Sequence, residues 1–480
     1  MRLTTESPST PPPPSVAARP RPILQVSTSD VGGGAEKIAW NLHRAYRARG
    51  YESWLAVGSS RSSADRVVTI PNDADRGTWA RGVIGAANLL RPLVGRVRGA
   101  WLARHLLVDY LAEPRRALER ARGHEDFAFP ATWRLLTLPP ERPDILHGHN
   151  LHGGYFDLRA LPWLSHQLPV VLTLHDAWLL SGHCAHSFEC ERWRTGCGHC
   201  PDLTIYPAVP RDATAENWRR KQAIYARSRL YVATPSAWLA DRVRASMLAA
   251  ATADLRVIPN GVDRTVFRPH DQAAARAELG ISHGAPVLLF AANGIRRNIW
   301  KDYRTLRAAI ARLAAQEPDL PLLLLGLGEN SPPERIGEAQ VRFVPHQRDP
   351  AVVARYYQAA DLYVHAARVD TFPTTVIEAL ACGVPVVATA VGGIPEQVRP
   401  LPDERPTGIL TPPGDAAAIA RAVADLLRDQ PLRRRLAANA AADAAQRFDL
   451  ERQVDTYLSW YGEVRRDWAE QRQATLAAVS

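Results

Sequence analysis

Two carboxylates eight residues apart, Asp370 and Glu378, flank the start of a predicted helix. Pro373 suits the first turn of that helix, and Cys382 with Gly383 suits its end. A helix N-terminus presents unpaired amides and partial positive charge to an anion, and carboxylates accept hydrogen bonds from sugar hydroxyls. The spacing therefore suits a ligand in which a sugar is joined to a diphosphate. A surface helix that carries two ordinary acids has the same pattern.

A basic loop occupies residues 293–301. It begins with Asn293 and Gly294 and contains Arg296, Arg297 and Lys301. Two cations on one loop can neutralise a diphosphate. A solvated surface loop carries such pairs as well, and Arg297 is an alternative to Arg296 at the first position.

Four of the five cysteines, namely Cys184, Cys190, Cys197 and Cys200, fall within one short segment. Four thiolates can hold one zinc ion tetrahedrally. The spacing predicts structural zinc, with disulfides or free thiols as the alternative. Because no open ligand position is implied, the metal is not expected to be catalytic. The histidines of the same segment are alternative ligands: His183, His186 and His199.

Length and composition predict a globular protein with two domains. The chain has 480 residues, of which 46% are hydrophobic and 22% are charged, so it is too long for a single core. Its apolar runs are too short or too interrupted to span a membrane, and the proline-rich start lacks the apolar core of a signal peptide. We therefore expect a cytoplasmic protein with a disordered segment at residues 1–22.

The net charge of +10 indicates anionic partners. An anionic nucleotide explains this charge, and so does the anionic inner face of the cell membrane, on which the protein would be peripheral. No module that combines basic and aromatic residues for nucleic-acid recognition is visible, so nucleic acid is not expected as a partner.

Strands and helices alternate in two series along the chain, which predicts an α/β protein with two mostly parallel sheets. The first series begins at Ile23 and includes a tight glycine turn after the first strand; the second begins near Pro286, after a stretch of turn residues. We predict a first domain at residues 23–260, a second at residues 261–445, and a C-terminal helix at residues 446–480 that crosses back to the first domain.

A helical insert at about residues 78–122 interrupts the first series. From Arg81 to Arg122 it contains nine arginines and three acids, a balance of +6, with apolar residues between the arginines. One interpretation is a helical hairpin that packs on the sheet. The other is a face that rests on an anionic membrane, where a lipid-linked acceptor would be found.

Five motifs, in this order along the chain, resemble one known family. They are GGGAE at residues 32–36, TLHD at 173–176, RVIPNGVD at 256–263, NGIRRNIWK at 293–301 and DTFPTTVIE at 370–378. Together they resemble the retaining nucleotide-sugar glycosyltransferases of family 4, which have the GT-B fold of two facing Rossmann-like domains. The likeness covers residue 23 to about residue 461. The cysteine segment is similar to that of a subgroup that makes bacterial exopolysaccharides, such as the colanic-acid-type transferases.

The resemblance implies a role for each motif in a donor site. His175 would contact the donor sugar, Arg296 and Lys301 the diphosphate, Asp370 the sugar, and Glu378 the ribose hydroxyls. The family usually has glutamate where this chain has Asp370, and the aspartate side chain is shorter by about 1.5 Å. The other donor-binding residues that the resemblance implies are Gly33, Gly34, Asn293, Gly294, Arg297, Phe372, Pro373, Thr374 and Thr375.

The resemblance implies that a hexose moves from a nucleoside diphosphate sugar to a glycan or lipid-linked glycan acceptor. The anomeric configuration would be retained, and no cofactor would be required for catalysis. A nucleotide-sugar epimerase of the same fold and a catalytically silent binding subunit are the alternatives. An NAD-dependent dehydrogenase is disfavoured, because the glycine turn after the first strand lacks the dinucleotide-binding spacing.

Overall fold

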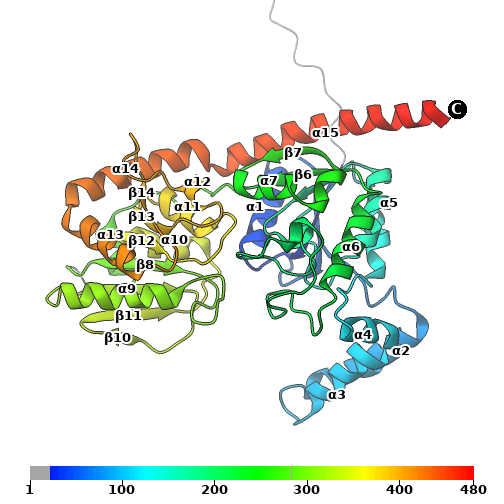
Figure 1. The fold of residues 1–480 in the computed structure, drawn as a ribbon, viewed down its shortest axis with the longest axis horizontal. Helices are drawn as coiled ribbons and strands as arrows, with labels where there is room; N and C mark the ends of the chain where they lie inside the picture. Colours follow the sequence, from blue (N-terminus) through cyan, green and yellow to red (C-terminus); the bar gives the residue numbers. More distant parts are fainter. Residues whose placement is uncertain (1–21, 283, 480) are drawn as a thin grey trace, which may run out of the picture.

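Two α/β domains lie side by side, and a long C-terminal helix runs along the first of them (Figure 1). The computed structural model describes residues 22–282 and 284–479. The disordered segment predicted at residues 1–22 therefore lies outside the described residues, apart from its last residue. Each domain contains one seven-stranded sheet covered by helices, and the predicted two-domain α/β architecture is confirmed.

The sheet of the first domain is wholly parallel and has the strand order β3-β2-β1-β4-β5-β6-β7. Its central strands are buried on both faces, as expected of a parallel sheet between helices. The strands are β1 Ile23–Ser29, β2 Ser53–Ser59, β3 Val67–Thr69, β4 Ile145–Gly148, β5 Val170–Thr173, β6 Leu230–Thr234 and β7 Thr252–Val257. The helices around this sheet are α1 Gly34–Ala48, α5 Leu161–Gln167, α6 Thr214–Tyr225 and α7 Ala237–Arg244.

The sheet of the second domain has the order β10-β11-β9-β8-β12-β13-β14, and only the β10–β11 pair in it is antiparallel. The strands are β8 Val287–Ala291, β9 Leu323–Leu327, β10 Glu334–Ile336, β11 Ala339–Val344, β12 Leu362–His365, β13 Val386–Thr389 and β14 Gly408–Thr411. The helices are α8 Gln272–Glu278, α9 Tyr303–Gln316, α10 Pro350–Ala359, α11 Thr374–Ala381, α12 Ile394–Gln397, α13 Ala416–Arg428 and α14 Gln430–Arg447.

The last helix, α15 (Leu450–Val479), returns to the first domain as predicted (Figure 1). Its buried face packs against α1 and the central strands of the first sheet. Tyr461 Oη lies 2.7 Å from His147 Nδ1, and Tyr457 Oη lies 2.7 Å from Thr173 Oγ1. These contacts join the last segment of the chain to β4 and β5.

The chain passes from one domain to the other twice, near Val262 and near Phe448, and these two segments contact each other. The Val262 amide donates to the Phe448 carbonyl at 2.8 Å, and the Leu450 amide donates to the Val262 carbonyl at 3.1 Å. Gly261 allows this approach, because a Cβ there would lie 2.5 Å from the Cα of Leu450. The junction is therefore a short two-stranded contact with no room for a larger residue.

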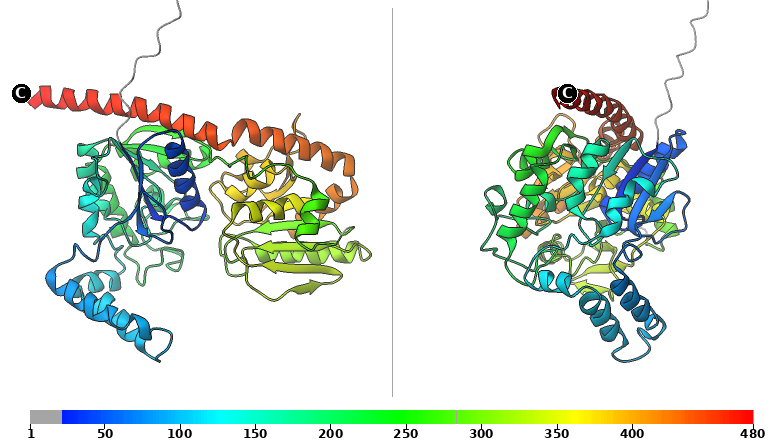
Figure 2. Two further views of the ribbon diagram at one scale, coloured as in Figure 1. Left: turned by 180° about the vertical axis from the view of Figure 1, so that it is seen from behind. Right: turned by 90° about the vertical axis from the view of Figure 1, so that its right-hand side faces the viewer.

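The helical insert forms an arm that extends away from the body of the first domain (Figure 2). Its elements are α2 Thr78–Asn88, α3 Ala100–Leu106, the π-helical turn Leu107–Leu111 and α4 Pro114–Ala121. It has a small core of its own, made by Ala80, Val83, Ile84 and Ala112. The interpretation as a hairpin packed on the sheet is wrong, because the arm's apolar residues contact one another or face solvent rather than the sheet.

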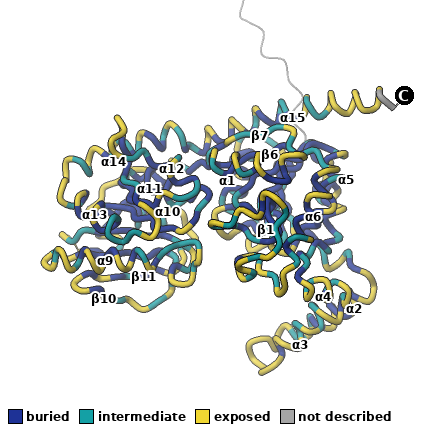
Figure 3. The backbone as a smooth tube through the Cα atoms, viewed as in Figure 1, coloured by how far each residue is buried: buried dark blue, intermediate teal, exposed yellow. Residues whose placement is uncertain are grey.

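Many residues of the arm are exposed (Figure 3). Among the described residues, eleven of the eighteen exposed large apolar side chains belong to it. None of the helices in the described part of the chain is both long and apolar enough to cross a membrane. The exposed apolar residues of the arm are Trp79, Leu89, Leu93, Val94, Val97, Trp101, Leu102, Leu106, Tyr110, Leu111 and Leu118.

Candidate functional site

The carboxyl ends of strands from both sheets meet at an interdomain cavity of about 390 Å³. In open parallel sheets this edge is where ligands bind. The segments after β1, β4 and β5 line the cavity from the first domain, and those after β8 and β12 line it from the second. The predicted site residues that this cavity brings together are Gly34, His175, Asn293, Lys301, Asp370, Phe372, Pro373, Thr374 and Thr375.

Lys301 and Asp370 form an ion pair on the second-domain wall. The Lys301 ammonium also lies 3.2 Å from His365 Nε2. Burial opposes ionisation of Asp370, but the Lys301 ammonium outweighs it and lowers the pKa of that carboxyl below its usual value. Burial and Lys301 lower the pKa of His365 to about 4, so its neutral ring accepts a hydrogen bond from Lys301. Of the three ammonium protons of Lys301, one is left for a ligand.

The loop that carries Asp370 is held by Gly392 and Gly393. The Gly393 amide donates to the Asp370 carbonyl at 3.2 Å. A Cβ on Gly392 would overlap the carbonyl oxygen of Asp370, and a Cβ on Gly393 would overlap that of Thr371. Gly392 also has a φ of +56°, which favours glycine. Close backbone approach therefore sets the position of Asp370.

Two helix N-termini lie at the cavity. The helix α1 begins at Gly34 and α11 begins at Thr374, and both residues line the cavity. Neither helix has a side-chain cap among the described residues. The first-turn amides therefore need acceptors from outside the helix. Together with Lys301, they make this cavity suited to an anion such as a diphosphate.

The first-domain wall contains a chain of buried histidines. His175 Nε2 lies 3.0 Å from His149 Nδ1. Burial lowers the pKa of His175 to about 4, although the nearby Asp176 carboxylate opposes this change. Burial lowers the pKa of His147 to about 3, and burial with the neighbouring histidines lowers that of His149 well below its usual value. These rings are neutral at pH 7 and act as hydrogen-bonding groups rather than cations.

Glu378 is buried outside this cavity. Its carboxylate accepts from Lys37 Nζ of the first domain at 2.6 Å and from Tyr357 Oη at 3.1 Å. Glu378 and Lys37 border a neighbouring cavity of about 70 Å³, and Thr374 lines both cavities. In this structure Lys37 occupies one carboxylate oxygen of the residue predicted to bind ribose.

The other predicted donor residues lie beside the cavity rather than in its wall. Gly33 is the N-cap of α1, and Gly294 adopts a φ of +68° in the turn after Asn293. Arg296 and Arg297 are exposed, and the Arg296 guanidinium lies 5.9 Å from the centre of the Phe343 ring. The structure thus brings Lys301, but not Arg296, to the cavity wall. The roles of these residues stay predictions.

Several cavity residues were not predicted from the sequence. Trp300, which precedes Lys301, stacks on Phe188 of the cysteine segment with ring centres 5.4 Å apart. The ring centre of His186, in the same segment, lies 5.2 Å from that of Trp300. In the sequence, Lys301 marks the loop that contains Trp300, and the cysteines mark the segment that contains His186 and Phe188. Neither feature indicates that the loop and the cysteine segment contact each other. The remaining cavity residues without a predicted role include Glu36, Asn150, Asp176 and Tyr206.

The cysteine segment does not form disulfides among its described residues. Burial raises the pKa of the Cys197 thiol to about 11 and that of Cys184 to about 12. Cys197 Sγ accepts from the Gly182 amide at 3.3 Å, and Cys200 Sγ lies 3.3 Å from His183 Nε2. Within the described residues, no three His, Cys, Asp or Glu side chains are placed to hold a metal ion. Structural zinc stays a prediction.

Comparisons with known proteins identify both halves of the chain. The model for glycosyltransferase family 4 matches residues 32–266, and the model for glycosyl transferases group 1 matches residues 271–443. A D-inositol 3-phosphate glycosyltransferase from Segniliparus rotundus is 34% identical over 222 residues, which are 44% of this chain and 48% of that protein. One from Stackebrandtia nassauensis is 32% identical over 333 residues, or 65% of this chain and 69% of that protein. The chain thus spans about half the length of the first relative and about two thirds of the second.

The fold also matches solved structures. HepE from Anabaena, solved in complex with UDP and glucose, aligns with a TM-score of 0.58 at 17% identity. The alignment covers 92% of this chain and 99% of that one. At this identity the likeness shows that the two proteins share the fold.

We expect the histidine chain to make the protein sensitive to acid. In the unfolded chain these residues bind protons near pH 6.5, whereas in the folded protein His175 does so near pH 4 and His147 near pH 3. Between these values the unfolded state binds more protons, so stability is lost as the pH falls from about 6.5 to about 4. Calorimetric unfolding temperatures over this range measure the loss.

The variant His149→Gln tests one of the three buried histidines, because glutamine stays neutral over the whole pH range. We expect it to reduce the proton uptake on unfolding by about one proton. The matched control is His270→Gln, which replaces an exposed histidine of the second domain. Equal pH dependence in the wild type and His149→Gln would contradict the assignment.

Proposed function

The chain belongs to the glycosyltransferases that combine a family 4 domain with a group 1 domain, and we propose an activity on that basis. We propose that it transfers a hexose from a nucleoside diphosphate sugar to a glycan or lipid-linked glycan. The observation that supports this most directly is the meeting of Lys301, Asp370 and the N-terminus of α11 in one interdomain cavity, opposite His175. That arrangement offers positive charge to a diphosphate and hydrogen-bonding groups to a sugar. We place the proposed reaction in the synthesis of a bacterial surface polysaccharide or exopolysaccharide.

The donor diphosphate would bind Lys301 and the first-turn amides of α11. As the glycosidic bond breaks, negative charge grows on the leaving phosphate, and these preorganised groups stabilise it. We propose that the leaving phosphate takes the proton of the acceptor hydroxyl on the same face of the sugar, so that configuration is retained. Lys301 and the amides supply the positive charge in this scheme, without a requirement for a metal ion. Asp370 and His175 would orient the donor sugar.

Glu378 would bind the ribose hydroxyls after releasing Lys37. The carboxylate now bonded to Lys37 across the domains can accept two hydroxyl donors when that ammonium withdraws. Closure of the two domains on the donor would exclude water, which would otherwise hydrolyse it.

We also propose that the arm rests on an anionic membrane. Its exposed apolar side chains would enter the interface, and its arginines would lie among anionic headgroups. Arg81, Arg91, Arg96, Arg98 and Arg115 are exposed and form no ion pair with a described residue. A lipid-linked acceptor would be presented at this surface.

Incubation with a panel of nucleoside diphosphate sugars and lipid-linked glycan acceptors tests the transfer. We expect glycosylated product only when donor and acceptor are both present. Lys301→Ala should lower the rate about 100-fold, because one preorganised cation at the developing charge is lost. Arg434→Ala, an exposed arginine on α14, should have no effect. Epimerised donor without acceptor would indicate the epimerase, and nucleotide binding without any product would indicate a silent binding subunit.

Flotation with vesicles tests the membrane proposal. We expect the protein to float with vesicles of phosphatidylcholine and phosphatidylglycerol, and less with phosphatidylcholine alone, because the arm is basic. Replacing Trp101 and Leu102 by alanine should weaken binding, since both are exposed on α3. Leu476→Ala, an equally exposed site on α15, is the control. Binding without dependence on the anionic lipid argues against the proposal.

Metal analysis tests the structural zinc that we propose for the cysteine segment. We expect about one zinc ion per purified chain, held by Cys184, Cys190, Cys197 and Cys200. Its removal should loosen the segment that contacts Trp300 and lower the thermal stability of the protein. Well under one zinc per chain, with all four thiols freely reactive, excludes this proposal.

A further inference from the structure

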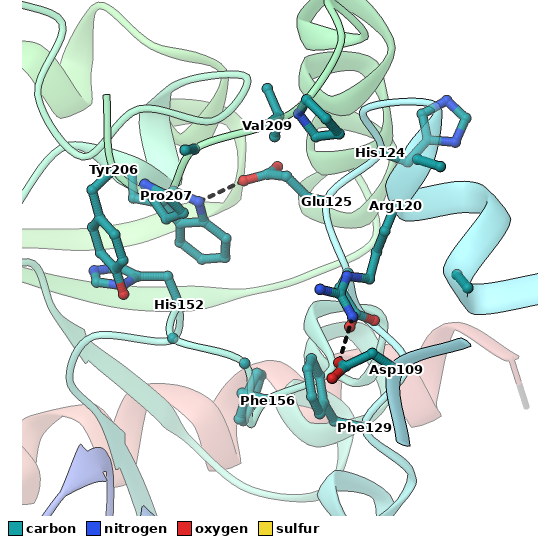
Figure 4. A pocket seen from close by; sticks show the side chains of 18 of the residues that line it. Asp109, Arg120, His124, Glu125, Phe129, His152, Phe156, Tyr206, Pro207 and Val209 are labelled. Atoms are coloured by element: carbon teal, nitrogen blue, oxygen red, sulfur yellow. Dashed lines mark hydrogen bonds and ion pairs between the residues drawn. The ribbon is translucent and has the colours of Figure 1, made fainter. Parts of the chain in front are cut away.

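A second and larger cavity, of about 680 Å³, lies at the base of the arm (Figure 4). The arm contributes one wall through Asp109, Tyr110 and Arg120, and residues 206–211, which follow the cysteine segment, contribute another. The loop after β4 closes the third side with His152 and Phe156. The arm and residues 206–211 are both outside the parallel sheet and the helices that cover it. A cavity of this size can hold a ligand of several hundred daltons.

Aromatic rings form much of the lining. Phe129, Phe156 and Trp178 are buried in its wall, whereas Tyr110 and Tyr206 are about half exposed. Such rings offer flat apolar faces to a ligand, and the tyrosines add hydroxyls that can donate or accept hydrogen bonds. A saccharide has both apolar ring faces and hydroxyls, so the lining matches its chemistry.

The Trp178 wall is rigid because a buried ion pair supports it. Lys221 Nζ lies 2.9 Å from a carboxylate oxygen of Glu125 and 3.9 Å from the centre of the Trp178 ring. The indole N–H of Trp178 donates to the other Glu125 oxygen at 2.5 Å. Lys221 is fully buried and also donates to the carbonyls of Trp178 and Ser181. These bonds fix the ring before any ligand binds.

The charges that line the cavity are mostly neutralised within the protein. Arg120 Nη1 lies 2.9 Å from Asp109 Oδ1, and Asp126 is bonded to Arg116 at 2.6 Å. Glu125 is paired with Lys221, as described above. Arg211 is the lining cation without an ion pair among the described residues. A phosphorylated ligand needs converging cations, so this lining favours a neutral one.

Three residues lie between this cavity and the interdomain cavity of the proposed donor site, called the donor cavity below. Tyr206 lines both cavities, while His152 lines the larger one and Asp176 the donor one. His152 Nε2 lies 2.7 Å from Asp176 Oδ2, and His152 Nδ1 lies 3.3 Å from Tyr206 Oη. Burial lowers the pKa of His152, but the Asp176 carboxylate outweighs it and leaves that pKa raised. The two cavities are therefore adjacent at this group of residues.

We infer that the cavity at the base of the arm binds the acceptor as a neutral saccharide, with Tyr206 and the His152–Asp176 pair at the passage to the donor. This inference rests on the proposed glycosyl transfer and specifies its acceptor. The sugar at the end of the glycan occupies the aromatic lining, and its hydroxyl extends past Tyr206. His152 is a positioning residue here, since it acts through Asp176 and Tyr206.

Binding of octyl glycosides of glucose, galactose and mannose, measured by saturation-transfer NMR, tests the inference, with D-inositol 3-phosphate as the anionic comparison. We expect at least one neutral glycoside to bind the wild type. Ala121→Trp and Ala208→Trp fill the cavity from opposite walls, and both alanines are exposed. Each variant should weaken glycoside binding about tenfold or more. Ala86→Trp, at an exposed position on α2 outside the cavity, should leave it unchanged.

Nucleotide affinity, measured by calorimetry on the same proteins, separates this test from that of the donor site. Both filled variants should bind UDP or GDP as the wild type does, which also verifies that they are folded. The inference is overturned if no neutral glycoside binds, if the filled variants bind as the wild type does, or if only D-inositol 3-phosphate binds and the filled variants lose it. If no nucleotide binds the wild type, the donor proposal fails, and glycoside binding still decides the cavity.

Discussion

The burial of α15 against the first domain is the contact on which the interdomain site depends. Tyr457, Trp460 and Tyr461 are buried there, and each such aromatic side chain removes about 150–250 Å² of surface from water. Tyr457 is hydrogen-bonded to Thr173, two residues before His175. The helix that continues from the second domain is therefore joined to a strand that ends at the interdomain cavity. The end of the chain thus contributes α14 to the core of the second domain and α15 to the core of the first.

A second constraint acts from the other side of the cavity, through residues 392–396. Gly392 and Gly393 hold the Asp370 loop by close backbone approach. In the same segment, Glu396 accepts hydrogen bonds from the amides of Ala237 and Trp238 at the start of α7. One short segment thus sets the position of a predicted sugar contact and caps a helix of the opposite domain. Movement between the domains would change both together, so the geometry of Asp370 depends on the interdomain contact.

The two series of alternating strands and helices predicted the two mostly parallel sheets, because the central strands of both sheets are buried apolar runs. Short or partly exposed strands such as β7 and β10 carry a weaker pattern of this kind. The arm was ambiguous because an amphipathic helix does not specify what its apolar face contacts. In the site, the motifs located Lys301, Asp370 and His175. The pairing of Glu378 with Lys37 joins residues 341 apart in the chain, and no local pattern contains it.

The donor and acceptor halves of the proposed reaction are built from different kinds of structure. The donor cavity uses the ends of core strands and the starts of α1 and α11, which the fold itself brings together. The larger cavity uses the arm and residues 206–211, which the sheets do not require. A change in those segments can alter the acceptor without moving Lys301 or Asp370. The relatives are named D-inositol 3-phosphate glycosyltransferases, whereas the acceptor that we propose for this chain is a neutral saccharide, because the cavity at the base of the arm has paired charges and aromatic rings in its lining. In the proposed reaction, the donor site would therefore come from the shared fold, and the choice of acceptor would come from the segments added to it.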